Sequence, residues 1–363
     1  MTDLDYITRA LELAARGRGF VEPNPMVGAV VVRDGVVVGE GWHERYGEAH
    51  AEVNALKRAG EKARGATLYV TLEPCCHHGK TPPCTDAVIA AGIRRVVASM
   101  RDPFAAVAGR GLIILREAGV EVVEDIGGPA ARSLNAPYLT FLRAGRPWIH
   151  GKWAMSLDGK IASFTGSSQW ITSDSARANA HELRGRMDGI LIGRGTLATD
   201  DPILTARPAG PRQATRIVLT SGQTPLPDTC RLLQTVDEAP VLVIGDSKYA
   251  NRFEHWRQRG AEIVALPELD AGSIAAELGR RRMTNVLIEG GPRTLGTFMD
   301  ARLIDEVHAY IAPKLIGGET APSAIGGQGI AKIDDALMIR DWKWESLGAD
   351  LYGNGRVVAS GQE

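Results

Sequence analysis

The stretch that decides the fold is ATLYVTLEPCCHHGKTPPCTDAVIAAGI, residues 66–93. It begins with an apolar run that is typical of a buried strand and ends in a helix that begins at or near Cys84. Further strands and helices alternate on both sides of it, which indicates an α/β layered sheet. The loop between them holds three cysteines and two histidines. A zinc ion takes about four ligands at most, so only some of these side chains can bind one.

A second motif, His50-Ala51-Glu52, opens a helix upstream of this loop. A His-x-Glu pair followed by Pro-Cys and a later cysteine is the pattern of zinc deaminases. Pro74-Cys75 matches this pattern, although Cys84 follows Cys75 at a longer spacing than usual. We predict that His50, Cys75 and Cys84 bind Zn²⁺ and leave its fourth position open for water.

The residue types explain the chemistry. Zinc lowers the pKa of its water to about 7, so hydroxide exists at neutral pH and can attack a ring carbon that bears an amino group. A proton must then reach the leaving nitrogen, and Glu52 stands where a catalytic carboxylate could carry it. The starts of the two helices, near His50 and Cys84, favour ionised thiolates.

The remaining loop side chains leave alternatives open. Pro74 restricts the strand exit and aims Cys75, which makes Cys75 a better ligand than Cys76. His77 and His78 are expected to face substrate or solvent. The rival interpretations are a closed structural zinc site, made by a cysteine pair with a loop histidine, and core thiols without metal.

Length and composition limit the class of protein. A chain of 363 residues is expected to form two domains. Its 42 basic and 43 acidic residues give a net charge of −1, which offers no general attraction for nucleic acid or an anionic membrane. Clustered cysteines fit metal binding in a reducing cytosol, and no apolar run approaches the length of a membrane span, about 20 residues. We expect a cytoplasmic protein.

The order of elements divides the chain in two. An amphipathic helix at the N-terminus precedes two valine-rich runs around Asp34-Gly35, a strong hairpin signal. Residues 135–148 contain two prolines and a glycine between patterned segments, which indicates a connection, so we place the boundary near Ala144. The second half repeats the α/β pattern and ends in an antiparallel hairpin over 338–359.

The motifs resemble one family throughout. The stretches 23–32, 47–56 and 70–93 look like the deaminase domain of the bifunctional riboflavin-biosynthesis deaminase/reductase family, and 155–162, 168–173, 193–207, 288–296 and 310–318 look like its reductase domain. The resemblance implies a cytidine-deaminase-like three-layer domain over 1–144 and a dihydrofolate-reductase-like domain over 145–363. It also implies NADPH as cofactor, a homo-oligomer, and a small-molecule substrate, a diaminopyrimidinone with a ribosylamino 5-phosphate.

Site residues in the first domain follow by resemblance. Asn24, His43 and Lys80 are implied as substrate contacts. Asn24 could instead cap a turn, and Lys80 could be solvated. The sequence departs from the family at Cys76, where serine is usual, and we expect activity to survive this change.

The second domain has no G-x-G-x-x-G after its first strand, so a Rossmann domain is not expected. The turn at Gly290-Gly291, between a buried strand and a helix, could bind phosphate, but alone it is a weak signal. The resemblance implies cofactor contacts from Ala154, Trp170, Thr196, Asp200, Ser221, Gly291, Pro292, Arg293, Thr294, Leu295, Gly296 and Thr297. It implies substrate contacts from Ser168, Arg184, Leu204, Arg207 and Glu289, with Lys152 as a further one.

Two competing functions remain. A deaminase that acts on nucleic acid would need a basic face and stacking aromatics, and neither the charge nor the 6% of aromatic residues offers them. A structural zinc scaffold would have no use for Glu52 beside an open metal position. In the second domain, Trp170 could instead be a core residue, and Arg184 a solvated helix residue.

Overall fold

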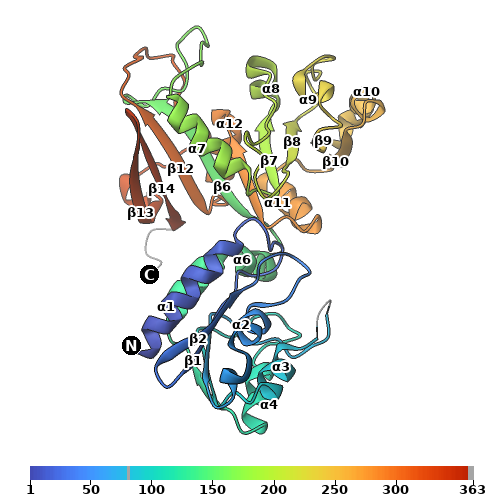
Figure 1. The fold of residues 1–363 in the computed structure, drawn as a ribbon. Coiled ribbons are helices and arrows are strands. Elements are labelled where there is room, and N and C mark those ends of the chain that lie inside the picture. Colours follow the sequence, from blue (N-terminus) through green and yellow to red (C-terminus); the bar gives the residue numbers. More distant parts are fainter. Residues whose placement is uncertain (80–81, 359–363) are drawn as a thin grey trace. The chain divides into compact units, whose positions relative to one another are not determined.

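The computed structural model describes residues 1–79 and 82–358 (Figure 1). The chain divides into two compact units, Met1–Ala144 and Gly145–Glu363. Each unit has its own sheet. None of the described helices is long and apolar enough to cross a membrane.

The first unit is built on a five-stranded sheet in the order β2-β1-β3-β4-β5. Strand β1 pairs antiparallel with β2 and β3, whereas β3, β4 and β5 are parallel. Asp34 and Gly35 turn the β1–β2 hairpin with φ of 50° and 77°, which suits Asp-Gly in a two-residue turn. The predicted hairpin is confirmed. The strands are β1 (Gly28–Arg33), β2 (Val36–Trp42), β3 (Thr67–Val70), β4 (Arg95–Ala98) and β5 (Glu121–Glu124).

Helices cover both faces of this sheet, which makes three layers (Figure 1). On one face α1 (Asp3–Ala14) packs Ile7 and Ala10 against Val30. The other face receives α2 (Ala51–Ala59), α3 (Cys84–Ala90) and α4 (Arg110–Glu117). Helix α1 lies so close to β1 that a Cβ on Gly28 would sit 1.9 Å from Ala10 O of α1.

The prediction of a connection over residues 135–148 is wrong for most of this segment. It contains α6 (Ala136–Ala144), and α5 (Gly128–Leu134) directly precedes it. Proline at the second position of α6 is no obstacle, since the first turn of a helix has no partner for its N–H groups. The Asn135 side chain joins this region to the segment before β1, because it accepts a hydrogen bond from Met26 N at 2.8 Å and donates one to Met26 O at 2.9 Å.

The second unit holds a nine-stranded sheet in the order β10-β9-β8-β7-β11-β6-β12-β14-β13. The strands from β10 to β12 in this order are parallel, and β14 and β13 continue the sheet antiparallel, as the predicted terminal hairpin. The strands are β6 (Trp148–Ser156), β7 (Gly189–Gly193), β8 (Thr215–Thr220), β9 (Val241–Asp246), β10 (Glu262–Leu266), β11 (Asn285–Glu289), β12 (Glu306–Ala312), β13 (Met338–Leu347) and β14 (Asp350–Val358).

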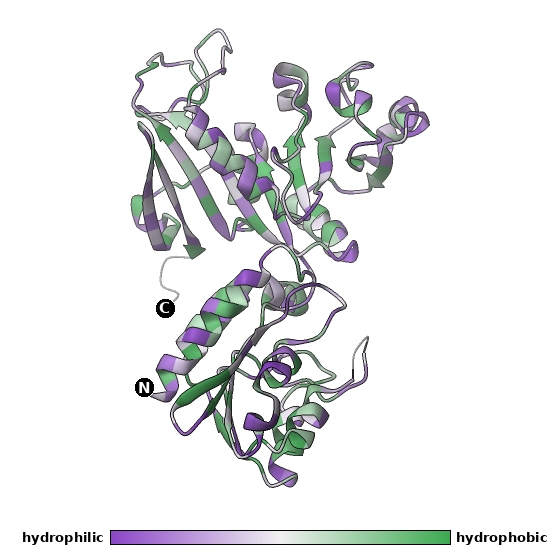
Figure 2. Cartoon of the chain, viewed as in Figure 1, coloured by the Kyte–Doolittle hydropathy of each residue, from purple (hydrophilic) through white to green (hydrophobic). Residues whose placement is uncertain are grey.

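The central strands are apolar on both faces, as a doubly covered parallel sheet requires. Ile190 and Ile192 of β7 belong to one core and Leu191 to the other, and Figure 2 shows β7 and β8 as mostly hydrophobic. The α/β class is confirmed, although α8, α9 and α10 were not predicted. The helices are α7 (Asp174–Arg184), α8 (Arg194–Asp200), α9 (Arg231–Gln234), α10 (Glu254–Gln258), α11 (Ala271–Arg280) and α12 (Pro292–Asp300).

Candidate active sites

Three side chains meet at one corner of the first sheet. His50 Nδ1 lies 3.4 Å from Cys75 Sγ and 3.3 Å from Cys84 Sγ, and all three ligand atoms lie within 4.8 Å of one another. A tetrahedral zinc ion with Zn–S of about 2.3 Å and Zn–N of about 2.0 Å would hold a sulfur and a nitrogen about 3.6 Å apart. Both the donor set and its spacing therefore fit zinc.

Local structure explains why these residues converge. His50 is the N-cap residue of α2, and Cys84 is the first residue of α3. Cys75 follows β3, and its backbone O accepts from Thr85 N at 3.2 Å, which ties the loop to the start of α3. The Cys84 N–H also donates to Cys75 Sγ at 3.4 Å. The hydrogen bond from the Cys84 thiol, with a contribution from His50, lowers the pKa of Cys75.

Glu52 stands beside this group on the first turn of α2. Its side chain is only 3% exposed, and its carboxyl is in hydrogen-bond contact with the Cys84 thiol. Burial raises the pKa of Glu52 to about 7. A carboxyl group in this position can hold a proton near neutral pH and release it to a neighbour.

Two of the residues implied as substrate contacts adjoin the metal ligands. Asn24 Nδ2 lies 3.4 Å from His43 Nε2, while His43 Nδ1 lies 3.2 Å from Ala49 O. The His43 and His50 rings stand edge to face, with centroids 5.3 Å apart. Burial lowers the pKa of His43, which favours a neutral ring. Lys80, the third of these residues, lies outside the described residues.

The other loop side chains point elsewhere. Cys76 Sγ donates to Ala106 O at 3.7 Å, and the His77 ring packs against Phe104 with centroids 5.7 Å apart. Neither belongs to the group of ligand atoms around His50.

Sequence reasoning missed the support behind the cysteine loop, which comes from Glu73. Its buried carboxylate accepts from the backbone N–H groups of Asp102, Gly109 and Gly111 at 3.1, 2.9 and 2.9 Å. These bonds fasten the segment before α4 against the loop that carries Cys75. Several backbone donors hold a buried carboxylate in one position. Its signal in the sequence was its place two residues before a metal ligand.

In the second unit a buried ion pair joins α7 to the end of β11. Arg184 Nε donates to Glu289 Oε1 at 2.7 Å and Nη2 donates to Oε2 at 2.5 Å. Burial raises the pKa of Glu289, but the charges of Arg184 and Lys152 outweigh it and hold this pKa at about 2. Burial also lowers the pKa of Lys152, whose Nζ lies 5.3 Å from the centre of the Tyr310 ring.

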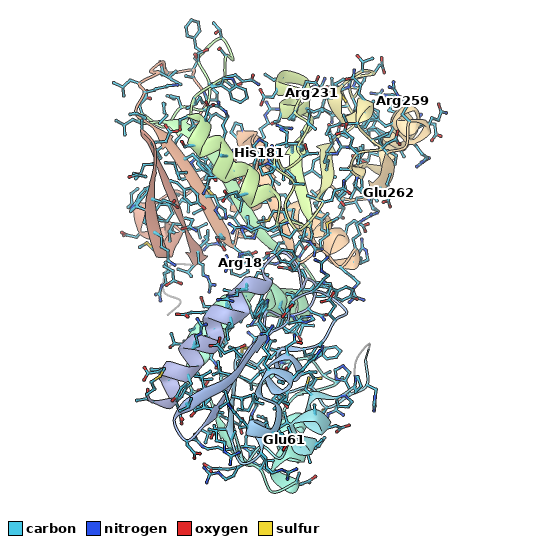
Figure 3. All side chains as sticks on the ribbon, viewed as in Figure 1. Arg18, Glu61, His181, Arg231, Arg259 and Glu262 are labelled. Carbon is cyan, nitrogen blue, oxygen red and sulfur yellow. The ribbon has the colours of Figure 1, made fainter. Side chains whose placement is uncertain are left out.

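Arg207 and His181 lie next to this pair. Arg184 Nη1 donates to Thr205 O at 3.4 Å, and Arg207 Nη1 donates to Thr205 Oγ1 at 3.2 Å. His181, which sequence reasoning missed, lies 3.1 Å from Thr205 O through Nδ1 and 3.5 Å from Arg207 through Nε2 (Figure 3). Its spacing of three residues before Arg184 on one helix was the signal that could have found it. Such a cluster suits an anion.

The turn after β11 has the geometry of a phosphate-binding turn. Gly290 and Gly291 have φ of 76° and 74°, and α12 starts directly afterwards with Pro292. A Cβ on Gly291 would lie 3.0 Å from Thr196 Oγ1 and 3.7 Å from Thr294 Oγ1. Two hydroxyls therefore lie beside a turn that only glycine leaves open, at the start of a helix, which fits a cofactor phosphate.

The other residues implied for this unit are scattered around these two features. Ser168 Oγ donates to Asp200 Oδ1 at 3.1 Å. Trp170 is 64% exposed, so it is no core residue, and Arg177 lies 4.5 Å over its ring. Leu204 is buried with φ of 60°. Ala154 lies on β6, Ser221 directly follows β8, and Arg293, Leu295, Gly296 and Thr297 lie on α12.

Two family models match the chain, one in each of its two units. Residues 1–100 match the cytidine and deoxycytidylate deaminase zinc-binding region, and residues 147–352 match the RibD C-terminal domain. The zinc-binding region contains the His50, Cys75 and Cys84 group.

Curated relatives and solved structures agree over nearly the full length. The chain is 44% identical to riboflavin biosynthesis protein RibD of Aquifex aeolicus over 96% of this chain and 97% of that protein, and 42% identical to RibD of Escherichia coli over 97% and 98%. A structure of Acinetobacter baumannii RibD superposes with a TM-score of 0.86 at 34% identity, over 98% of this chain and 99% of that one.

A Thermotoga maritima structure, described as a diaminohydroxyphosphoribosylaminopyrimidine deaminase/5-amino-6-(5-phosphoribosylamino)uracil reductase, superposes with a TM-score of 0.84 at 35% identity, over 98% of this chain and 99% of that one. The match therefore extends across both units in one polypeptide. The chain belongs to the RibD family of riboflavin biosynthesis, whose members join a zinc-binding deaminase domain to a reductase domain.

Proposed function

We propose that residues 1–144 deaminate a diaminopyrimidinone carrying a ribosylamino 5-phosphate, and that residues 145–363 then reduce the ribosyl group to ribityl with NADPH. The observation that carries the first half is the buried Glu52 beside the convergent His50, Cys75 and Cys84. A closed structural zinc site has no need of a titratable carboxyl next to its thiols.

In the first reaction, His50, Cys75 and Cys84 would hold the ion, and zinc when bound supplies an activated water at neutral pH. Glu52 takes the proton that this water loses and delivers it to the amino nitrogen as ammonia leaves. Its pKa of about 7 suits a group that both accepts and donates. Asn24 and His43 orient the pyrimidine, since Asn24 contacts His43 and the His43 ring stands against that of His50.

In the second reaction, NADPH when bound supplies the hydride, and the chain's task is to hold both partners. The Gly291–Thr297 segment and Thr196 are proposed to bind its phosphates. Arg207, with Arg184, holds the substrate phosphate, because guanidinium groups pair with two oxygens at once. Lys152 and Glu289 then face the opened ribose, whose reduced carbon would take the hydride while the heteroatom bonded to it would take a proton from solvent.

By similarity to the family, we propose a homo-oligomer with a small phosphorylated pyrimidine as its substrate. The four cysteines in the described chain are free thiols, which supports a location in the reducing cytoplasm.

The test of the deaminase assignment is Glu52→Gln. Deamination should fall by roughly 10²–10⁴-fold, the usual size of a general acid/base contribution, while zinc content and reduction of the deaminated intermediate stay unchanged. Loss of zinc together with activity would contradict the proton-transfer role.

A further inference from the structure

A second group of metal-ligand side chains lies in the other unit, among the described residues. His150 is on β6, and Glu306 and His308 are on β12. These strands are parallel neighbours in which Glu306 pairs with His150. Because side chains alternate along a strand, Glu306 and His308 project from the same face of the sheet, next to His150.

The ligand atoms converge. His150 Nδ1 lies 3.1 Å from His308 Nε2, His308 Nε2 lies 3.4 Å from Glu306 Oε1, and His150 Nδ1 lies 3.9 Å from Glu306 Oε2. Nitrogen and oxygen ligands at about 2.0–2.2 Å from a tetrahedral zinc ion stand about 3.3–3.5 Å apart. The three separations bracket this value, so small side-chain adjustments suffice to bind an ion.

Each of the three ligands also has an outer partner. His150 Nε2 lies 3.2 Å from Asn285 Oδ1, His308 Nδ1 lies 2.7 Å from Tyr352 OH, and Trp148 Nε1 donates to Glu306 Oε2 at 3.2 Å. Asn285 is on β11 and Tyr352 on β14, the strands that flank β6 and β12. Outer hydrogen bonds of this kind fix the rings of metal-binding histidines and leave the inner nitrogens to the metal.

Both histidine rings are buried, with His150 at 6% and His308 at 1% exposed. The positive charges of Arg186 and Lys152 act on His308 and would oppose a bound metal ion. This group should therefore bind a metal more weakly than a site with two thiolates.

We propose that His150, Glu306 and His308 form a second divalent-metal site, which takes zinc or a similar ion that prefers imidazole and carboxylate ligands. In the metal-free protein the His308 Nε2–H donates to His150 Nδ1. When the ion enters, this proton moves to His308 Nδ1, where the Tyr352 hydroxyl accepts it, and both inner nitrogens become ligands. No proton needs to leave the network, and the fold is complete without the ion.

The register places this group next to predicted substrate contacts. His308 pairs with Lys152, and Lys152 pairs with Glu289. An ion held by His150, Glu306 and His308 would tie β6 to β12 directly beside these two residues.

The test counts zinc in the full-length protein at buffered free-zinc concentrations. Wild-type should take up two ions, the second at least 10-fold more weakly than the first, and His308→Asn should take up only one. His255→Asn, which removes a histidine from α10, serves as the matched control and should keep two. A single ion in the wild-type protein at saturating zinc would overturn the proposal.

A gentler variant guards against misfolding of His308→Asn. Glu306→Gln keeps the acceptor for Trp148 but removes the charge, and should weaken the second ion at least 10-fold with no change in deamination. Co²⁺ gives an independent readout: its first equivalent should add thiolate charge-transfer absorption, and its second should add only ligand-field bands. Thiolate absorption that grows with both equivalents would place the second ion elsewhere and overturn the assignment.

Discussion

Arg184 and Glu289 form a two-armed ion pair between α7 and the end of β11, with Nε–Oε1 at 2.7 Å. The arginine and glutamate side chains are 15% and 7% exposed. Both charges are thus largely removed from water, and each depends on the other.

This pair predicts an acid-sensitive contribution to stability. The pKa of Glu289 is about 2 in the folded protein, compared with about 4.3 in an unfolded chain. The carboxylate therefore stabilises the fold fully above pH 4.3, and this contribution is lost as the pH falls towards 2. Glu289→Gln should cost about 3 kcal/mol at pH 7, and the difference from wild-type should shrink between pH 4.5 and 2.5 in urea titrations. A constant difference in unfolding free energy between the two proteins over this pH range would contradict a stabilising role of the Glu289 charge.

Cys84 and Cys76 should respond differently to replacement by serine. Cys84→Ser removes a ligand atom 3.3 Å from His50 Nδ1, so zinc and deamination should be lost while reduction of the deaminated intermediate persists. Cys76→Ser is the matched control, because its Sγ faces Ala106 O rather than the other ligands. It should keep zinc, as measured by elemental analysis. Loss of zinc in both variants would refute this ligand set.

Arg207 should act on substrate binding. Arg207→Ala removes a charge-assisted contact to the phosphate, worth about 1.5–3 kcal/mol, so KM of the reductase should rise roughly 10–100-fold with little change in kcat. Arg257→Ala, on the remote helix α10, should leave both constants unchanged. The prediction fails if KM is unaltered in Arg207→Ala.

Gly28 should resist any side chain. A Cβ there would lie 1.9 Å from Ala10 O, so Gly28→Ala must push α1 off the sheet. Overpacking of this kind costs about 1–3 kcal/mol and should lower the Tm of the deaminase unit by several degrees in calorimetry. Gly195→Ala is a control, since nothing lies within 4 Å of its Cβ position. An unchanged Tm in Gly28→Ala would show that α1 adapts freely.

Short-range patterns were sufficient for much of the fold and for the metal ligands. Asp34-Gly35 marked a hairpin because two residues alone set that turn, and the spacing of His50, Cys75 and Cys84 reflects one strand-loop-helix unit. Segments with conflicting local signals were misjudged. Pro137 concealed α6, although a proline in the first helical turn is harmless.

Contacts between distant strands could not be read from the sequence. The approach of His150 to His308 depends on β6 and β12 being neighbours in register, and nothing local announces that pairing. The Arg184–Glu289 pair likewise joins residues 105 positions apart. Such contacts follow from sheet order, which forms only when the whole unit is assembled.

The most direct measurement is the mass of the products formed from the diaminopyrimidinone ribosylamino 5-phosphate by the zinc-loaded protein, with and without NADPH. Without NADPH the product should have one amino group replaced by oxygen and no other change. With NADPH it should also gain two hydrogens. An unchanged substrate mass in both reactions would contradict the assignment of the two domains.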